Sequence, residues 1–242
     1  MTSAAQQGNG ALTAVRTSLS EQLSALRGVA PAELPGPLLH VAVRRIELAG
    51  GDVYMLRPAD WEALRLAEVA ADRPVPFWAR PWPSGLALAA ELAEAPPEQG
   101  ARVLELGCGL GVPSIVAARA GAVVLATDGA SDAVAFAAHS MALNDVRGDV
   151  AHADWAAQGE ALVERGPFDL VLGADVLYTR GNADTAARLL PRLLADGGEV
   201  RIADPGRSNS APFLAAARAS FSLESRHEGD ISFYTLRPRR RS

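Results

Sequence analysis

The stretch VLELGCGLG, residues 103–111, places three glycines directly between a predicted strand and a predicted helix. The short, mostly apolar run before the glycines is typical of a buried strand, and Pro113 fits the first turn of a following helix. Glycines at such a turn let the backbone approach a ligand, and open α/β sheets bind ligands at this edge. We therefore expect Gly107, Gly109 and Gly111 to form a ligand-binding loop.

The residues around these glycines indicate which ligand the loop takes. Dinucleotide-binding turns follow G-x-G-x-x-G, and their pyrophosphate lies on the helix N-terminus. Here Val112 occupies the last glycine position, and Glu105 precedes the first glycine by two residues. A carboxylate at Glu105 would repel a pyrophosphate, whereas the sulfonium and ammonium groups of S-adenosylmethionine are positive. The motif therefore favours that methyl donor over NAD.

Acidic side chains after the next two predicted strands suit an adenosine group. Asp128 ends the strand over 123–128, and a carboxylate there accepts hydrogen bonds from ribose hydroxyls, in NAD enzymes as well. A helix N-cap is the alternative role for Asp128. Asp154 offers a hydrogen-bond acceptor for the amino group of adenine, and Trp155 offers a flat apolar wall for its ring. The alternative role of this pair is packing at the surface.

Strand and helix patterns alternate from residue 101 onward. Five strand-like runs separated by helical segments predict an α/β fold with a doubly wound, mostly parallel sheet. The last two runs, SLESRHEGD and ISFYTLRP, have no helix between them and predict an antiparallel edge. Together they make a seven-stranded sheet.

The N-terminal part is organised differently. Leucine and valine spacing over 12–27 predicts an amphipathic helix, and LLHVAVRRIELAGGDVYMLRP predicts a β-hairpin. Asp60 is expected to cap a short helix. We expect a disordered tail over 1–11, a helix, hairpin and cofactor-capping segment over 12–96, a cofactor-binding core over 97–238 and a basic tail over 239–242.

Composition limits the partners of the chain. Its 242 residues are 49% hydrophobic with a formal net charge of −5, which is ordinary for a globular protein and gives no global attraction to nucleic acid or anionic membrane. The single cysteine excludes an internal disulfide, and the four histidines lack metal-binding spacing. No signal-peptide pattern and no membrane-spanning run is present. We expect a cytoplasmic protein without metal, a monomer or homodimer, binding neither nucleic acid nor membrane.

Several motifs together resemble the class I, seven-strand S-adenosylmethionine-dependent methyltransferases over roughly residues 38–238. The resemblance is carried by PFWARPWPSGLALA, VLELGCGLG, ATD, FDLVLGADVLY and LLPRLLADGGEVRIADPGR. The chain is most similar to the protein lysine methyltransferase branch with the electron-transfer-flavoprotein β-subunit enzyme, and to bacterial nicotinamide N-methyltransferase-like relatives. The resemblance implies a Rossmann-like fold and places Trp82 beside the methionine end of the donor. It leaves two roles open for Trp78, as part of the pocket wall or as part of the core. The helix over 12–27 has no counterpart in the family pattern.

The segment GADVLY, residues 173–178, carries the acceptor chemistry by this resemblance. Methyl transfer needs a positioned lone pair and no metal, so orientation and control of protonation dominate. The D-x-x-Y motif of the branch matches Asp175 and Tyr178. Asp175 would therefore orient an amine, and Tyr178 would line the pocket beside the amine or form a hydrogen bond with it. Their alternative roles are a loop cap and packing. Enzymes that methylate the amino group of adenine or a glutamine amide typically carry the motif [DN]-P-P-[YF] at this place. Here Val176 and Leu177 stand in place of both prolines, which disfavours adenine and glutamine-amide acceptors.

The predicted site is therefore a donor pocket next to an acceptor carboxylate. The candidate cofactor-binding residues are Trp82, Glu105, Gly107, Cys108, Gly109, Gly111, Asp128, Gly129, Asp154, Trp155 and Ala174, and the candidate catalytic residues are Asp175 and Tyr178. The leading hypothesis is an N-methyltransferase for protein lysine; a small-molecule N- or O-methyltransferase of a biosynthetic pathway and a non-catalytic cofactor-binding module are the alternatives. The segment ADPGR, residues 203–207, either reaches the substrate mouth or forms a plain turn.

Overall fold

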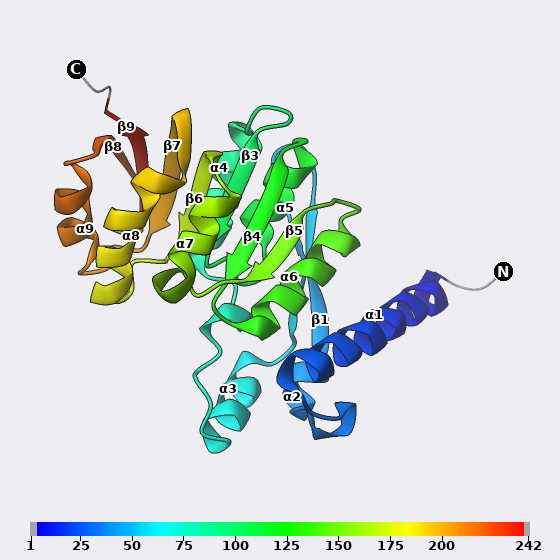
Figure 1. Ribbon diagram of the computed structural model, residues 1–242. Helices are drawn as coiled ribbons and strands as arrows, with labels where there is room; N and C mark the ends of the chain where they lie inside the picture. Colours follow the sequence, from blue (N-terminus) through cyan, green and yellow to red (C-terminus); the bar gives the residue numbers. More distant parts are fainter. Residues whose placement is uncertain (1–3, 240–242) are drawn as a thin grey trace.

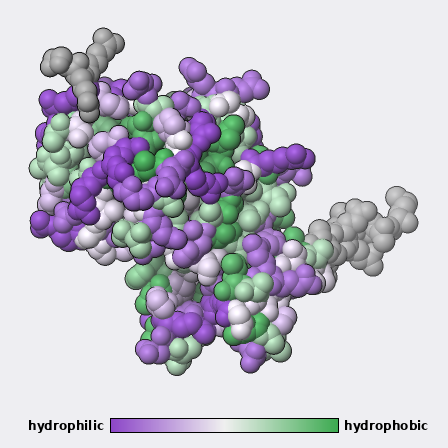
Figure 2. Space-filling model, in the orientation of Figure 1, coloured by the Kyte–Doolittle hydropathy of each residue, from purple (hydrophilic) through white to green (hydrophobic). Residues whose placement is uncertain are grey.

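The computed structural model describes residues 4–239, with side chains from residue 13 onward. Figure 1 shows a twisted central sheet with helices on both faces, and the N-terminal helix extending away from the sheet. Figure 2 shows that hydrophilic side chains dominate the same view of the surface, with smaller hydrophobic areas between them.

Seven strands form the central sheet, in the order β5-β4-β3-β6-β7-β9-β8. The strands are β3 (Arg102–Leu106), β4 (Val123–Asp128), β5 (Asp149–His152), β6 (Phe168–Ala174), β7 (Leu194–Asp204), β8 (Phe221–Glu228) and β9 (Ile231–Pro238). Strands β3 to β7 are parallel, whereas β9 runs antiparallel to both β7 and β8. The predicted doubly wound sheet with an antiparallel edge is confirmed.

Helices cover the two faces of the sheet and build a separate hydrophobic cluster on each. The helices are α4 (Pro83–Glu94), α5 (Val112–Arg119), α6 (Ser131–Leu143), α7 (Trp155–Arg165), α8 (Arg180–Leu193) and α9 (Ser210–Ala217). Buried residues of α4, α5 and α6 belong to one cluster, and those of α7, α8 and α9 belong to the other. Because both faces are covered, the central parallel strands β3, β4 and β6 are mostly buried.

The N-terminal part adds helices and a two-stranded sheet. Its elements are α1 (Ala4–Arg27), a 3-10 turn (Pro31–Glu33), α2 (Gly36–Leu39), β1 (Val41–Ile46), β2 (Val53–Pro58), α3 (Trp61–Ala70) and a second 3-10 turn (Phe77–Ala79). Strands β1 and β2 pair antiparallel, which confirms the predicted hairpin. Asp60 caps α3 by accepting a hydrogen bond from the Ala63 N–H at 2.9 Å.

Helix α1 begins earlier than the sequence pattern predicts. It includes residues 4–11, which the composition assigns to a disordered tail, while residues 1–3 lie outside the described part of the chain. Extending a helix that is already nucleated needs no second nucleation step, so the segment continues the helix although Gly8, Asn9 and Gly10 are poor helix formers.

The N-terminal elements share the core of the sheet domain. Leu19 and Leu23 of α1 are fully buried in the same hydrophobic cluster as Phe136 of α6. The Leu56 N–H in β2 donates to the buried Ser140 hydroxyl of α6 at 3.0 Å. The expected ranges 12–96 and 97–238 therefore form one packed unit.

Candidate cofactor and acceptor site

A cavity of about 970 Å³ lies at the carboxyl ends of β3, β4 and β6. Every candidate site residue named from the sequence lines this cavity. It has the size of a small-molecule site, and its position at the carboxyl edge of a parallel sheet is where such folds bind ligands.

The glycine loop needs glycine for both conformation and packing. The φ angles of Gly107, Gly109 and Gly111 are +67°, +52° and +78°, which L side chains rarely adopt. A Cβ at Gly109 would lie 3.2 Å from the Trp78 carbonyl oxygen. The loop therefore lies directly against the backbone of the Pro/Trp segment.

Cys108 is a small packing residue within this loop. It is buried, and its N–H donates to the Thr127 carbonyl at 2.9 Å. Burial raises the pKa of the Cys108 thiol well above its ordinary value, and the nearby Asp128 and Glu105 act in the same direction. The thiol therefore stays protonated and is not a nucleophile at neutral pH.

Glu105 has a local partner that the sequence pattern does not reveal. The N–H of Ser114, in the first turn of α5, donates to its carboxylate at 3.0 Å, and the Ser114 hydroxyl donates to the same oxygen. Burial raises the pKa of Glu105 to about 8, although the hydrogen bonds from Ser114 oppose this shift. A cation in the cavity would favour the ionised carboxylate.

Asp128 connects the glycine loop to the end of β4. Its two carboxylate oxygens accept hydrogen bonds from the N–H groups of Gly109 at 2.8 Å and Ala130 at 2.9 Å. Burial raises the pKa of Asp128, and these backbone hydrogen bonds oppose the shift. Asp128 thus fixes the shape of the loop, and it also lines the cavity together with Gly129.

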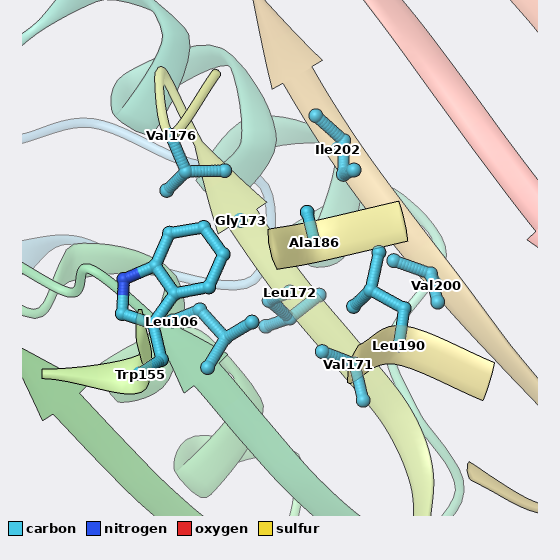
Figure 3. A pocket seen from close by; sticks show the side chains of 10 residues that line it. All are labelled: Leu106, Trp155, Val171, Leu172, Gly173, Val176, Ala186, Leu190, Val200 and Ile202. Carbon is cyan, nitrogen blue, oxygen red and sulfur yellow. The ribbon is translucent and has the colours of Figure 1, made fainter. Parts of the chain in front are cut away.

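The candidate adenine-binding pair begins helix α7. Asp154 is the N-cap of α7 and accepts a hydrogen bond from the Ala156 N–H at 3.0 Å. Trp155 lines the large cavity and also an apolar pocket of about 10 Å³ behind it. Figure 3 shows its ring directed toward Val176 and Gly173. The small pocket has no room for a ligand, so the ring acts as a wall between core and cavity.

Asp175 follows β6 in a strained conformation and is paired with an arginine. Its φ is +55°, which is uncommon for a residue other than glycine. Arg207 donates from Nε and Nη2 to its two carboxylate oxygens at 2.7 and 2.8 Å. The Asp175 side chain is 8% exposed, whereas Tyr178 is 56% exposed at the rim. Backbone strain and a charge-assisted pair therefore coincide at this residue, at the edge of the cavity.

Arg207 is a site residue that the sequence analysis left undecided. Its backbone is held by Asp204, whose Oδ1 accepts from the N–H groups of Gly206 and Arg207, both at 2.8 Å. The segment 203–207 therefore forms a turn and also reaches the cavity. Hydrogen bonding to Asp175 raises the pKa of Arg207, so its guanidinium stays charged.

The tryptophans before α4 both line the cavity. The Trp82 Nε1–H donates to the Phe77 carbonyl at 2.8 Å, which fixes the ring beside the opening. Trp78 also packs against Phe136 with ring centroids 5.0 Å apart, so it contributes to pocket and core together. Arg80 lies between Trp82 and Trp61, and nothing in the sequence pattern singles it out.

The family model described as lysine methyltransferase matches residues 79–217. The chain belongs to this lysine methyltransferase family. The matched region contains the glycine loop, the candidate acceptor carboxylate and Arg207.

Relatives and solved structures agree with this family. The family member described here is 38% identical over 144 residues to an electron transfer flavoprotein β-subunit lysine methyltransferase of Xenopus laevis, covering 57% of this chain and 57% of that protein. A ubiquinone biosynthesis O-methyltransferase of Caulobacter is 31% identical over 127 residues, covering 52% of this chain and 50% of the relative. The chain thus spans about half the length of these relatives.

A solved structure with the same fold is a T. thermophilus 16S rRNA methyltransferase in complex with AdoMet and guanosine. It has a TM-score of 0.62 and 18% sequence identity, covering 82% of this chain and 51% of that one. At this identity, the likeness supports the class I fold.

None of the helices in the described part is long and apolar enough to cross a membrane. Within the same residues, no group of three or more histidine, cysteine, aspartate or glutamate side chains is placed to hold a metal ion.

Proposed function

We propose that this lysine methyltransferase family member transfers the methyl group of S-adenosylmethionine to a protein lysine side chain. The observation that carries the proposal is the position of Asp175, which lines the same cavity as the glycine loop at the end of β6. A donor bound along the loop and an amine held by Asp175 would share one enclosed space.

The residues that line the cavity fit this donor chemically. Asp154 and Trp155 would hold the adenine, and Asp128 the ribose, because these side chains follow β5 and end β4, which are neighbouring strands. Glu105 and the glycine loop would receive the positively charged methionine part, with Trp82 and Ala174 beside it. When bound, the donor supplies an electrophilic methyl group on a sulfonium.

The acceptor amine must lose a proton before it can react. With an ordinary lysine pKa near 10.4, freeing the lone pair at pH 7 costs about 4–5 kcal/mol. Asp175 would orient the amine, while burial beside the Arg207 cation favours the neutral form. Tyr178, exposed at the rim, would contact the chain that carries the lysine.

A second candidate is methyl transfer to a small molecule. The similarity to a ubiquinone biosynthesis O-methyltransferase favours it, and so does the pairing of Arg207 with Asp175, because an ion pair attracts an ammonium less than a free carboxylate does.

A labelling experiment distinguishes these functions. The full chain would be mixed with methyl-labelled S-adenosylmethionine and either a cell lysate or purified electron-transfer flavoprotein as the first acceptor. Because the chain contains no lysine, labelling of its own lysines cannot obscure the result. We expect label in lysines of the protein fraction, whereas label only in small molecules would support the second candidate.

The matched control is Asp175→Asn, which keeps the size of the side chain. We expect at least a roughly 100-fold loss of transfer, because the amine loses its orienting carboxylate, with donor affinity changed less than about threefold. Equal labelling by Asp175→Asn and wild type would contradict the acceptor role of Asp175. A lack of labelling by either would favour the non-catalytic alternative.

A further inference from the structure

We propose that Arg80 is the anchor for the α-carboxylate of the methyl donor. This inference rests on the proposed function, because it assigns the negatively charged end of that donor. The argument depends on the charges that line the cavity, the way Arg80 is held, and its position along the predicted path of the donor.

The charged residues that line the cavity are mainly acidic. The carboxyl side chains are Glu105, Asp128, Asp154 and Asp175. These groups suit the sulfonium and the ammonium of the donor, but they would repel its carboxylate. A zwitterionic methionine end therefore requires at least one cationic contact in this cavity.

Among the described residues, two arginines line the cavity, and they differ in the contacts that their guanidinium groups already make. Arg207 uses Nε and Nη2 to bind both oxygens of Asp175. The Arg80 guanidinium makes neither a hydrogen bond nor an ion pair with any described residue, and the indole rings of Trp82 and Trp61 lie 4.9 and 5.6 Å from its central carbon. Its N–H donors are therefore free for a ligand.

The two indole rings fix the Arg80 cation in place. The Trp82 and Trp61 Nε1–H groups donate to the carbonyls of Phe77 at 2.8 Å and Pro76 at 3.0 Å, so each ring is attached to the loop over 76–82. Contact between a guanidinium and aromatic rings stabilises the charge and leaves its N–H edges available. Such an edge matches a carboxylate, which accepts two parallel hydrogen bonds.

Arg80 also lies at the correct end of the predicted donor path. The adenosine end is assigned to β4 and β5, so the methionine end extends toward β3 and β6. The loop that carries Arg80 and the first turn of α4 after it cover this end, because a Cβ at Gly109 would meet the Trp78 carbonyl and a Cβ at Gly85 in α4 would lie 4.0 Å from the Ala174 Cβ. The donor carboxylate would therefore face the Arg80 guanidinium.

Two known ligands test the proposal without any methyl acceptor. Binding of S-adenosylhomocysteine and of its decarboxylated analogue would be measured by calorimetry on the full chain. We expect the wild type to bind S-adenosylhomocysteine about 10- to 100-fold more tightly, since one charge-assisted carboxylate contact is lost in the analogue. In Arg80→Gln we expect this preference to disappear, because only the affinity for S-adenosylhomocysteine falls.

Two further variants serve as controls. Arg65→Gln removes an exposed arginine of α3 that does not line the cavity, and it should keep the wild-type preference. Arg80→Lys should retain part of the preference, since lysine keeps the charge but not the two-pronged geometry. Unchanged melting temperatures would show that each variant is folded.

Three results would overturn the assignment. An equal loss of affinity for both ligands in Arg80→Gln would mean that Arg80 only shapes the cavity. Unchanged binding of both, with a raised KM for a protein acceptor, would assign Arg80 to a carboxylate of that acceptor. If the wild type binds neither ligand, the proposed donor itself is wrong, and the inference falls with it.

Discussion

At the scale of single residues, Glu105 is the side chain whose surroundings oppose its charge most clearly. It is 1% exposed, and burial raises its pKa from 4.5 to about 8. The hydrogen bonds from Ser114 reduce this shift without cancelling it. Burial therefore favours the protonated form of Glu105 over its carboxylate near neutral pH.

Because the folded protein holds this proton more tightly than the unfolded chain, Glu105 makes stability depend on pH. Its contribution is fully present below pH 4.5, decreases as pH rises, and is lost once pH passes about 8. Within that window the loss is about 1.4 kcal/mol per pH unit at most. We expect Glu105→Gln, which cannot ionise, to gain stability relative to wild type between these pH values.

Urea denaturation of both proteins at pH 5, 6, 7 and 8 measures this difference. Comparison of the two proteins isolates Glu105 from Asp128, whose pKa is also raised by burial. A difference in stability that stays constant with pH would show that Glu105 is ionised throughout.

At the scale of elements, the joint between α5 and α6 depends on Gly111. This residue is the N-cap of α5 in the left-handed region, with φ of +78°. A Cβ there would lie 3.1 Å from the Ala137 Cβ and 3.4 Å from the Ala137 Cα in α6. A side chain would therefore add strain in the backbone and overlap between the helices.

We expect Gly111→Ala to destabilise the fold by about 2–5 kcal/mol, the sum of left-handed strain and overpacking. Gly100→Ala is the matched control, since Gly100 has φ of +81° but nothing within 4 Å of an added Cβ. It should lose only the strain part, about 1–2 kcal/mol. Thermal or chemical denaturation gives both values, and equal losses would show that the helix contact is unimportant.

At the scale of the whole molecule, one arginine connects three distant helices. Arg27 ends α1 and forms ion pairs with Glu68 of α3 and Asp132 of α6, and all three side chains are at most 14% exposed. Arg73 is a second partner of Glu68, whereas no second cation pairs with Asp132 in the described part of the chain. Arg27 is therefore an ionic link between the N-terminal helix and the sheet domain, beside the apolar contacts of Leu19 and Leu23.

We expect Arg27→Met to cost about 3–5 kcal/mol in unfolding free energy, because it leaves the buried Asp132 carboxylate without its ion-pair partner. Arg27→Met combined with Asp132→Asn should recover part of the loss, since it removes the uncompensated charge. Chemical denaturation of both variants tests this, and Arg65→Met, on an exposed pair with Glu62, serves as the control. A loss no greater than that of the control would mean that α1 docks through its leucines alone.

The sequence by itself determined the sheet, the glycine loop and the neighbourhood of Asp175. These features follow from local rules: the alternation of strand and helix patterns, glycines where φ is positive, and strand ends that meet at one edge. It misplaced the start of α1 because the short polar segment adopts whichever structure its neighbour nucleates.

Only the tertiary structure decided how the charges of the site are paired. Arg207 reaches Asp175 from 32 residues away, Arg80 lies between Trp61 and Trp82, and burial changes the protonation of Glu105. The energy of such pairs depends on distances and on exclusion of water, and these are set when segments distant in the sequence pack together.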